Sequence, residues 1–145
     1  MTVKDILRER GWTTITIDGG APVSAVIRVM RSEGASALPV SGDGRHIDGL
    51  ITERDIMRAM RLTCVEGLMD IPVRTVMTRG VTTCRPEESL RRVMARLAAR
   101  CARHAVVIDD SVIWGVVSMA DVIEQRLAEA EQEIVATTSL CLVAS

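Results

Sequence analysis

Aromatic side chains are almost absent from this sequence. It contains no phenylalanine and no tyrosine, and Trp12 and Trp114 are its only tryptophans. A folded core must therefore consist of aliphatic side chains, which the hydrophobic content of 48% provides. Without aromatic residues among the basic ones, the chain lacks the stacking surface that single-stranded nucleic acid needs. The net charge of −1 also argues against a dedicated nucleic-acid binder, so we expect no nucleic-acid partner.

The sequence also lacks the segments that direct a chain into or across a membrane. Its first residues, MTVKDILRERG, contain no apolar stretch of the kind found in signal peptides. No apolar run approaches the roughly 20 residues of a membrane-spanning helix. The four cysteines, Cys64, Cys84, Cys101 and Cys141, do not have the spacing of a disulfide framework. We therefore expect a cytoplasmic protein with no membrane partner.

Motifs that carry catalysis are missing as well. There is no phosphate-binding G-x-x-x-x-G-K-[ST] loop, and no nucleophile stands at a spacing that pairs it with a base. Cys101 and His104 have the C-x-x-H spacing of half a metal site, but no second pair follows nearby. We expect no enzyme and no metal site. A metal or redox sensor would rest on these two residues and the scattered cysteines alone.

One short pattern, however, occurs twice. The stretch GLITERDIM begins at Gly49, and GVVSMADVI begins at Gly115, 66 residues later. Each stretch places a glycine, two apolar residues, a hydroxyl residue and then, three positions on, an aspartate. Ser/Thr-x-x-Asp/Glu ahead of an apolar run is the capping box that starts a helix, and one occurrence would need no other explanation. Two occurrences in register predict an internal repeat.

The repeat extends over most of the chain, and each copy has the order strand, helix, strand, strand, helix. The first strand is a short β-like run, the helix after it is amphipathic, and a hairpin with a turn-rich loop follows. The expected strands of the first copy are 14–17, 36–40 and 46–51 around a turn at 41–45, and those of the second copy are 81–84, 104–108 and 112–117 around a turn at 109–111.

Apolar residues at helical spacing mark the helices. Gly34 is expected to end the first helix of the first copy, and Cys101 is expected to lie on the buried face of its counterpart. The last predicted helix spans 121–136 and carries an apolar stripe, while the tail TTSLCLVAS after it is not assigned. The apolar positions are Val23, Val26, Ile27 and Met30 in the first copy, Leu90, Val93, Met94, Leu97 and Cys101 in the second, and Ile123, Leu127, Ala130 and Ile134 in the stripe.

This arrangement resembles a tandem pair of CBS domains, a small repeat that binds adenosine nucleotides in many regulatory proteins. The resemblance is carried by SALPV and GLITERDI in the first copy and by RHAVV and GVVSMADV in the second. The likeness is to small stand-alone bacterial members. It implies an α+β fold in which two β-α-β-β-α repeats pack about a pseudo-two-fold axis and leave two clefts. We expect repeats at 1–66 and 67–127 and a C-terminal extension at 128–145, and the family implies a homodimer.

The resemblance also implies site residues. We call the two repeated stretches, 49–55 and 115–121, the strand-to-helix corners. The aspartate of each corner, Asp55 or Asp121, is expected to accept hydrogen bonds from ribose hydroxyls. The hydroxyl residue of each corner, Thr52 or Ser118, is expected to lie near the phosphate. The physics agrees, because a carboxylate can accept from both ribose hydroxyls and the amide groups at a helix N-terminus attract phosphate.

Other positions follow from the family's pattern. Thr16 and Thr83 are expected to contact the nucleoside, and Arg54, Arg103 and His104 are expected to contact phosphate. The expected contacts of the base are Ser36, Ala37 and Pro39, together with Val106, which takes the place of the proline in the second copy. A histidine at a strand start more often makes a structural hydrogen bond, so both roles remain open for His104. The second corner has Met119 and Ala120 where the first is polar, which predicts that the cleft holding Asp55 binds phosphate more tightly.

The sequence therefore predicts a regulatory module that senses an adenosine compound such as AMP, ADP, ATP or NAD and requires no cofactor. Its ligand would shift the packing of the helices, and an unidentified regulated protein would respond. The alternative is a dimeric interaction scaffold whose ligand sites are vestigial. Both predict a homodimer, and binding of an adenine nucleotide distinguishes them.

Overall fold

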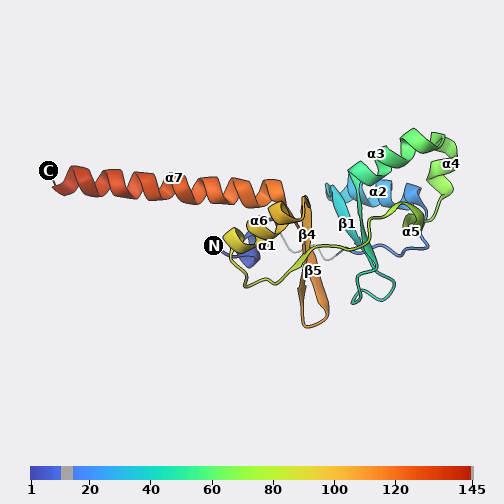
Figure 1. Cartoon of the computed structure of the whole chain (residues 1–145), viewed down its shortest axis with the longest axis horizontal. Coiled ribbons are helices and arrows are strands. Elements are labelled where there is room, and N and C mark those ends of the chain that lie inside the picture. Colours follow the sequence, from blue (N-terminus) through green and yellow to red (C-terminus); the bar gives the residue numbers. More distant parts are fainter. Residues whose placement is uncertain (11–14, 145) are drawn as a thin grey trace.

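The computed structural model describes residues 1–10 and 15–144, and short strands alternate with helices along the chain (Figure 1). The helices are α1 (Val3–Arg10), α2 (Val23–Glu33), α3 (Glu53–Leu62), α4 (Val65–Asp70), α5 (Val73–Val76), α6 (Leu90–Ala99) and α7 (Met119–Ala144). The strands are β1 (Ala37–Val40), β2 (Gly49–Thr52), β3 (Thr83–Cys84), β4 (His104–Asp109) and β5 (Val112–Ser118). The α+β class predicted from the sequence is confirmed, and α1, α4 and α5 are helices that the sequence analysis did not predict.

The strands form two small sheets, one in each repeat. In the first, β1 pairs antiparallel with β2. In the second, β4 pairs antiparallel with β5, and β3 joins β4 in the parallel direction. The strand expected at 14–17 is reduced to one parallel bridge between Ile17 and Val40, which corresponds to the pairing of β3 with β4. Thr14 lies outside the described residues.

Local sequence sets the ends of several helices. Gly34 follows α2 with a φ of 63°, the left-handed conformation of a glycine that ends a helix. Thr52 starts α3 with a complete capping box, because its side chain accepts from the Asp55 N–H while the Asp55 carboxylate accepts from the Thr52 N–H. Ser118 and Asp121 make the same two bonds at the start of α7. Both corners predicted from the sequence are therefore helix caps.

Each repeat has an aliphatic core, and a short helix near the start of each repeat packs into the core of the other. Helix α1 places Val3 among the buried residues of α6, β4 and β5, whereas α5 places Val73 among those of α2, β1 and β2. A third cluster joins the two sheets and consists of Ala37, Leu50, Val106 and Ile113. Each core therefore contains one helix from the other repeat, and this packing holds the two repeats together.

Helix α7 is the longest element and projects far from the rest of the molecule (Figure 1). Its first turns pack on α1, α6 and β5, where Val122 is fully buried. The helix then continues through the tail that the sequence left unassigned, and every side chain from 131 to 143 is exposed. Within residues 1–10 and 15–144, no helix combines the length and apolar character needed to cross a bilayer.

The expectation that Cys101 lies in the core is wrong. Helix α6 ends at Ala99, and Cys101 is exposed with a φ of 50° in the turn that leads to β4. The apolar spacing continues past the true end of the helix, and no glycine or proline marks that end in the sequence. The other apolar positions expected on this helix do pack into the core or against it.

Candidate functional site

Two hollows of similar size lie where the repeats meet. One, the Asp55 cleft, has a volume of about 360 Å³ and is lined by Thr52, Arg54, Asp55, Arg58, Thr78, Arg103 and His104, among others. The second, the Asp121 cleft, has a volume of about 350 Å³ and is lined by Arg10, Glu33, Ser36, Ala37, Pro39, His104, Ser118 and Asp121, among others. Each cleft thus combines the corner of one repeat with the strand start of the other.

Asp55 is held in place by bonds inside the protein. Its Oδ2 accepts from the Thr52 N–H at 3.0 Å and from the Thr52 hydroxyl at 2.9 Å, and its Oδ1 accepts from the Thr78 hydroxyl at 2.8 Å. Arg58 Nη1 lies 3.6 Å from the same Oδ1. The Asp55 side chain is only 3% exposed as a result. This carboxylate therefore accepts the hydrogen bonds that hold its corner together, and it also lines the cleft.

Asp121 has a more open surrounding. Its Oδ2 accepts from the Ser118 N–H at 2.9 Å and from Arg10 Nη1 at 2.6 Å. The Asp121 side chain is 20% exposed. The two aspartates cap their helices in the same way, but the third partner differs, since it is a threonine hydroxyl for Asp55 and an arginine for Asp121.

Two of the backbone amides at each corner already have a partner inside the protein. The Glu53 N–H donates to the Ser36 carbonyl at 3.1 Å, and the Met119 N–H donates to the Arg103 carbonyl at 2.7 Å. The amide of the corner aspartate donates to the capping hydroxyl in both repeats. Among the described residues, the amide between these two, that of Arg54 or Ala120, has no partner, so a phosphate at a corner could combine this one amide with arginine side chains.

His104 lies between the clefts and lines both of them, as does Ser36. The side chain is half-buried, and this burial lowers the pKa of His104, although the charge of Asp121 acts in the opposite direction. The imidazole is therefore mainly neutral near pH 7. It can donate or accept a hydrogen bond in either cleft without bringing a full charge.

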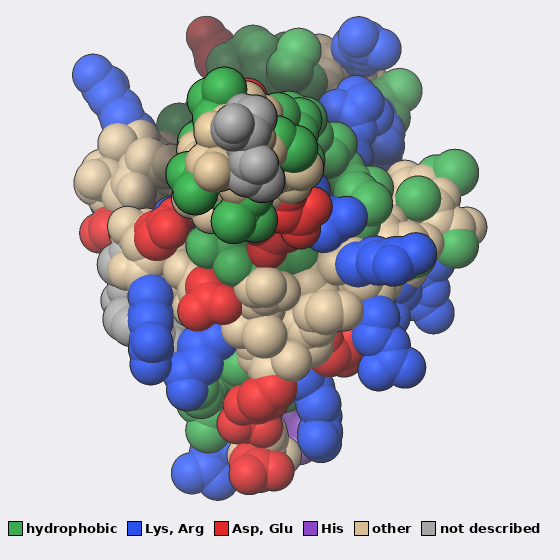
Figure 2. All heavy atoms as spheres, turned by 90° about the vertical axis from the view of Figure 1, so that its left-hand side faces the viewer, with side chains coloured by type: hydrophobic (Ala, Val, Ile, Leu, Met, Phe, Trp, Pro, Cys, Tyr) green, Lys and Arg blue, Asp and Glu red, His purple; other side chains and the backbone are tan. Residues whose placement is uncertain are grey.

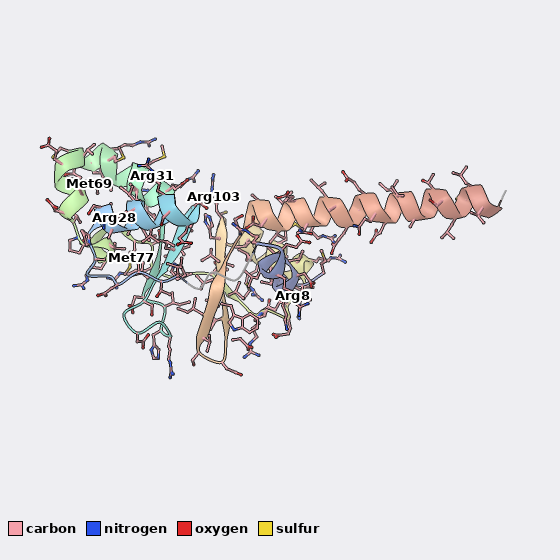
Figure 3. All side chains as sticks on the ribbon, turned by 180° about the vertical axis from the view of Figure 1, so that it is seen from behind. Arg8, Arg28, Arg31, Met69, Met77 and Arg103 are labelled. Carbon is pink, nitrogen blue, oxygen red and sulfur yellow. The ribbon has the colours of Figure 1, made fainter. Side chains whose placement is uncertain are left out.

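The structure brings most of the predicted site residues together, and each cleft is lined by residues of both repeats. Arg103, directly before β4 of the second repeat, lies at the junction of the two halves of the molecule (Figure 3) and lines the same cleft as Asp55 of the first repeat. Three predicted residues do not line either cleft. Thr16 is half-buried beside the bridge at Ile17, Thr83 lines a separate hollow with Arg96, and Val106 is fully buried between the sheets.

The cleft residues that sequence reasoning missed include the polar and charged residues Arg10, Glu33, Glu53, Arg58 and Thr78. Arg58 follows Arg54 by one helical turn, so the spacing could have indicated it. Arg10 and Thr78 come from segments that pack against the other repeat, and nothing local marks them. As for metals, no group of three or more His, Cys, Asp or Glu side chains within 1–10 and 15–144 is arranged to hold an ion.

Comparison with known proteins agrees with this architecture. The profile of the CBS domain matches residues 3–62 and 73–128. The chain is 29% identical over 111 residues to the 5'-AMP-activated protein kinase subunit gamma-3 of Bos taurus, covering 72% of this chain and 22% of that protein. It therefore spans about a fifth of that relative. The crystal structure of the CBS domain NE2398 superposes with a TM-score of 0.77 and 29% identity, covering 88% of this chain and 98% of that one.

Two further structures share the fold at lower identity. The CBS domain of a bacterial CNNM/CorC family Mg²⁺ transporter, solved in complex with ATP, has a TM-score of 0.67 and 22% identity over 86% of this chain and 85% of that one. The CBS domain pair of protein MJ0100, solved with 5'-methylthioadenosine and S-adenosyl-L-methionine, has a TM-score of 0.70 and 21% identity over 90% of this chain and 98% of that one.

Proposed function

The chain belongs to the CBS-domain family as a tandem pair, and from this we propose that it is a regulatory module that binds an adenosine-containing small molecule between its repeats. Structures of the same fold hold ATP in one case and adenosine derivatives without phosphate in another. The compounds we expect to bind here are AMP, ADP, ATP and NAD, together with those derivatives. No catalytic step is part of the proposal.

The observation that carries the proposal is the composition of the two clefts. Each one joins a capped aspartate from one repeat to polar or basic side chains from the other. A ligand in such a cleft contacts both repeats at once. It therefore stabilises the arrangement of the repeats that it fits best and shifts the population toward it. A partner protein that contacts the helices can respond to this shift.

Calorimetric titration of the folded protein with AMP, ADP, ATP and NAD tests the proposal, with GTP as the control for base preference. We expect saturable heat from at least one adenosine compound and a weaker signal from GTP. If all adenosine compounds remain silent at millimolar concentration while circular dichroism shows folded protein, the binding proposal fails. The dimeric interaction scaffold with vestigial sites would then be the better account.

We propose in addition that the chain is a homodimer. The apolar stripe predicted from the sequence lies on α7, where Ile123 is 44%, Leu127 60% and Ile134 65% exposed. Figure 2 views the molecule from the C-terminal end of α7 and shows hydrophobic side chains around that end. A projecting helix with such a face is more stable when it is paired than when it stands alone in water.

The spacing of the stripe favours a parallel pair of α7 helices. Leu127, Ala130 and Ile134 continue at the same alternating spacing to Thr137 and Cys141, which is the three-and-four alternation of a coiled coil. In a parallel pair, Arg126 of one copy would face Glu131 of the second copy, and the same contact would recur across the two-fold axis. This charge pairing supports a second copy of the chain as the partner of α7.

Oxidative cross-linking tests this arrangement in a background that carries Cys64→Ser and Cys101→Ser. Cys141 should cross-link efficiently because the two copies meet at this position. The matched control moves the cysteine to the opposite face of the helix with Cys141→Ser and Ser139→Cys, and it should cross-link poorly. Equal cross-linking of the two variants, or only monomer in light scattering at micromolar concentration, would contradict the parallel dimer.

A further inference from the structure

The Asp55 cleft contains a surplus of available positive charge. Arg54, Arg58 and Arg103 line it together with two carboxylates, those of Glu53 and Asp55, so that arginines outnumber carboxylates. All three arginine side chains are exposed. Within the described residues, only Arg58 has a carboxylate partner, the carboxylate of Asp55 at 3.6 Å. The guanidinium groups of Arg54 and Arg103 are therefore available, and a planar guanidinium can hold two phosphate oxygens at once.

The Asp121 cleft has the opposite character. Among the described residues that line it, Arg10 is the only arginine or lysine, and its guanidinium is already engaged by Asp121 at 2.6 Å. Glu33 adds a second carboxylate to the lining. The sequence of 11–14, GWTT, contains no ionisable side chain, so it does not alter this balance. A phosphate group entering here would meet carboxylates and no available cation.

The contrast arises at positions that correspond between the repeats. Positions of the corner and the helix after it differ by 66, so Arg54 corresponds to Ala120 and Arg58 to Glu124. Positions ahead of the hairpin differ by 67, so Arg103 corresponds to Ser36. Each arginine of the Asp55 cleft is thus matched by an uncharged or acidic residue. The fold is shared by both repeats, and the charge difference belongs to this particular sequence.

The two carboxylates also differ in how well they can meet a ribose. Asp55 is 3% exposed, and the Thr78 hydroxyl already donates to its Oδ1. Asp121 is 20% exposed, and no group among the described residues donates to its Oδ1. Asp121 can therefore accept a hydrogen bond from a ribose hydroxyl with less rearrangement. The Asp55 cleft therefore offers the stronger contact with phosphate, and the Asp121 cleft offers the stronger contact with ribose.

From these charges and exposures we infer that the two clefts prefer different adenosine compounds. The Asp55 cleft takes a compound with several phosphates, whose negative charge the available arginines attract. The Asp121 cleft takes an adenosine compound without phosphate, either uncharged or positively charged, which its carboxylates favour. This inference rests on the proposed function and names the ligand class of each cleft. The two ligands bind together because they occupy separate clefts.

Equilibrium dialysis with labelled adenosine and ATP tests whether the two ligands bind together. Saturating ATP should leave the bound amount of adenosine unchanged within about twofold, because each ligand has its own cleft and the two linings share only Ser36 and His104 among the described residues. S-adenosylmethionine, an adenosine compound with a positive charge, should displace adenosine and leave ATP in place. Mutual displacement of adenosine and ATP would overturn the inference.

Arginine variants assign each ligand to its cleft. The double variant Arg54→Ala/Arg103→Ala should weaken ATP binding about tenfold or more and leave adenosine binding within about twofold of wild type. The matched control is Arg28→Ala/Arg31→Ala, which removes two exposed arginines of α2 that line neither cleft (Figure 3). This control should bind both ligands like wild type. An equal loss of ATP and adenosine binding in the first variant would overturn the inference.

The converse variant adds positive charge near Asp121. Ala120→Arg/Glu124→Arg places arginines at the positions that correspond to Arg54 and Arg58, and both positions are exposed on α7. In this variant ATP should compete with adenosine, and unchanged selectivity would count against the inference. If adenosine, ATP and the other adenosine compounds all fail to bind to folded wild-type protein, the proposed function itself fails. If both bind but without this selectivity, only the inference about the ligand classes fails.

Discussion

The guanidinium of Arg10 lies 2.6 Å from the carboxylate of Asp121, although 111 positions separate the two residues in the chain. Arg10 ends α1, and Asp121 belongs to the corner that starts α7. The contact therefore joins the N-terminal helix to the second repeat, in agreement with the packing of Val3 into that repeat's core. It also engages one oxygen of the carboxylate that faces the Asp121 cleft.

Removal of this ion pair should have a small and salt-dependent effect on stability. Arg10 is 50% exposed and Asp121 20% exposed, so solvent screens their attraction, and we expect Arg10→Ala to lower the free energy of unfolding by about 0.2–1 kcal/mol. Urea unfolding at low and high salt measures this change, which should shrink as salt rises. Arg28→Ala, on the exposed face of α2, serves as the control. An effect that is independent of salt would show that the ion pair is not its source.

Replacement of Asp55 should destabilise the fold more than replacement of Asp121. Asp55→Ala removes the acceptor for the Thr52 N–H and for the hydroxyls of Thr52 and Thr78. Buried donors that lose their acceptor and a helix that loses its cap together predict a loss of about 2–4 kcal/mol. Asp121→Ala should cost less because this side chain is more exposed. Equal losses in chemical denaturation would contradict this account, and Asp55→Asn is the milder variant for binding experiments.

The glycine that opens the first corner is required by a close backbone approach. A Cβ atom on Gly49 would lie 2.7 Å from Met77 Sδ and 2.8 Å from the Thr78 carbonyl oxygen, and that same oxygen accepts from the Leu50 N–H at 2.9 Å. We expect Gly49→Ala to lower the free energy of unfolding by about 1–3 kcal/mol, because the backbone at Thr78 must move. Gly42→Ala, where a Cβ meets nothing closer than 4.0 Å, should be nearly neutral in the same thermal melts.

The two histidines should titrate on opposite sides of the ordinary imidazole pKa of about 6.5. A hydrogen bond to the Asp43 carboxylate raises the pKa of His46, whereas burial lowers the pKa of His104. NMR titration of the imidazole resonances measures both values in one sample. Asp43→Asn should return His46 toward the ordinary value and leave His104 unchanged. Coincident titration of the two histidines in wild-type protein would refute the assignment.

The sign of the His104 shift fixes its effect on stability. Because the folded protein holds His104 with a lowered pKa, the unfolded chain binds more protons as the pH falls through about 6.5. Acidification through this range should therefore reduce the stability of wild-type protein, and His104→Gln should show a smaller reduction. The raised pKa of His46 acts in the opposite sense, since its contribution is present at low pH and is lost as the pH rises through the folded-state value.

The sequence by itself determined the local structure of each repeat. The hydroxyl and aspartate of each corner, three positions apart, form the predicted capping boxes, because a cap needs only neighbours in the chain. Gly34 ends α2 for the same kind of reason. In the hairpin of the second repeat, Asp110 and Ser111 adopt the positive φ values that a tight turn requires. The repeated order of these elements carried the resemblance to CBS pairs, and that resemblance implied the α+β fold.

Tertiary structure alone decided which residues share a cleft. Arg103 lines the cleft of Asp55 because the two sheets pack against each other, and Arg10 meets Asp121 because α1 packs into the core of the second repeat. Periodicity shows that a segment has an apolar face but does not say which of two similar cores will bury it. Periodicity also failed to show where α6 ends. The helix ends at Ala99, so Cys101 does not lie on the buried helix face on which it was expected. Contacts between distant segments depend on how all the surfaces fit together, so the pairing of charges across the clefts became visible only in the folded chain.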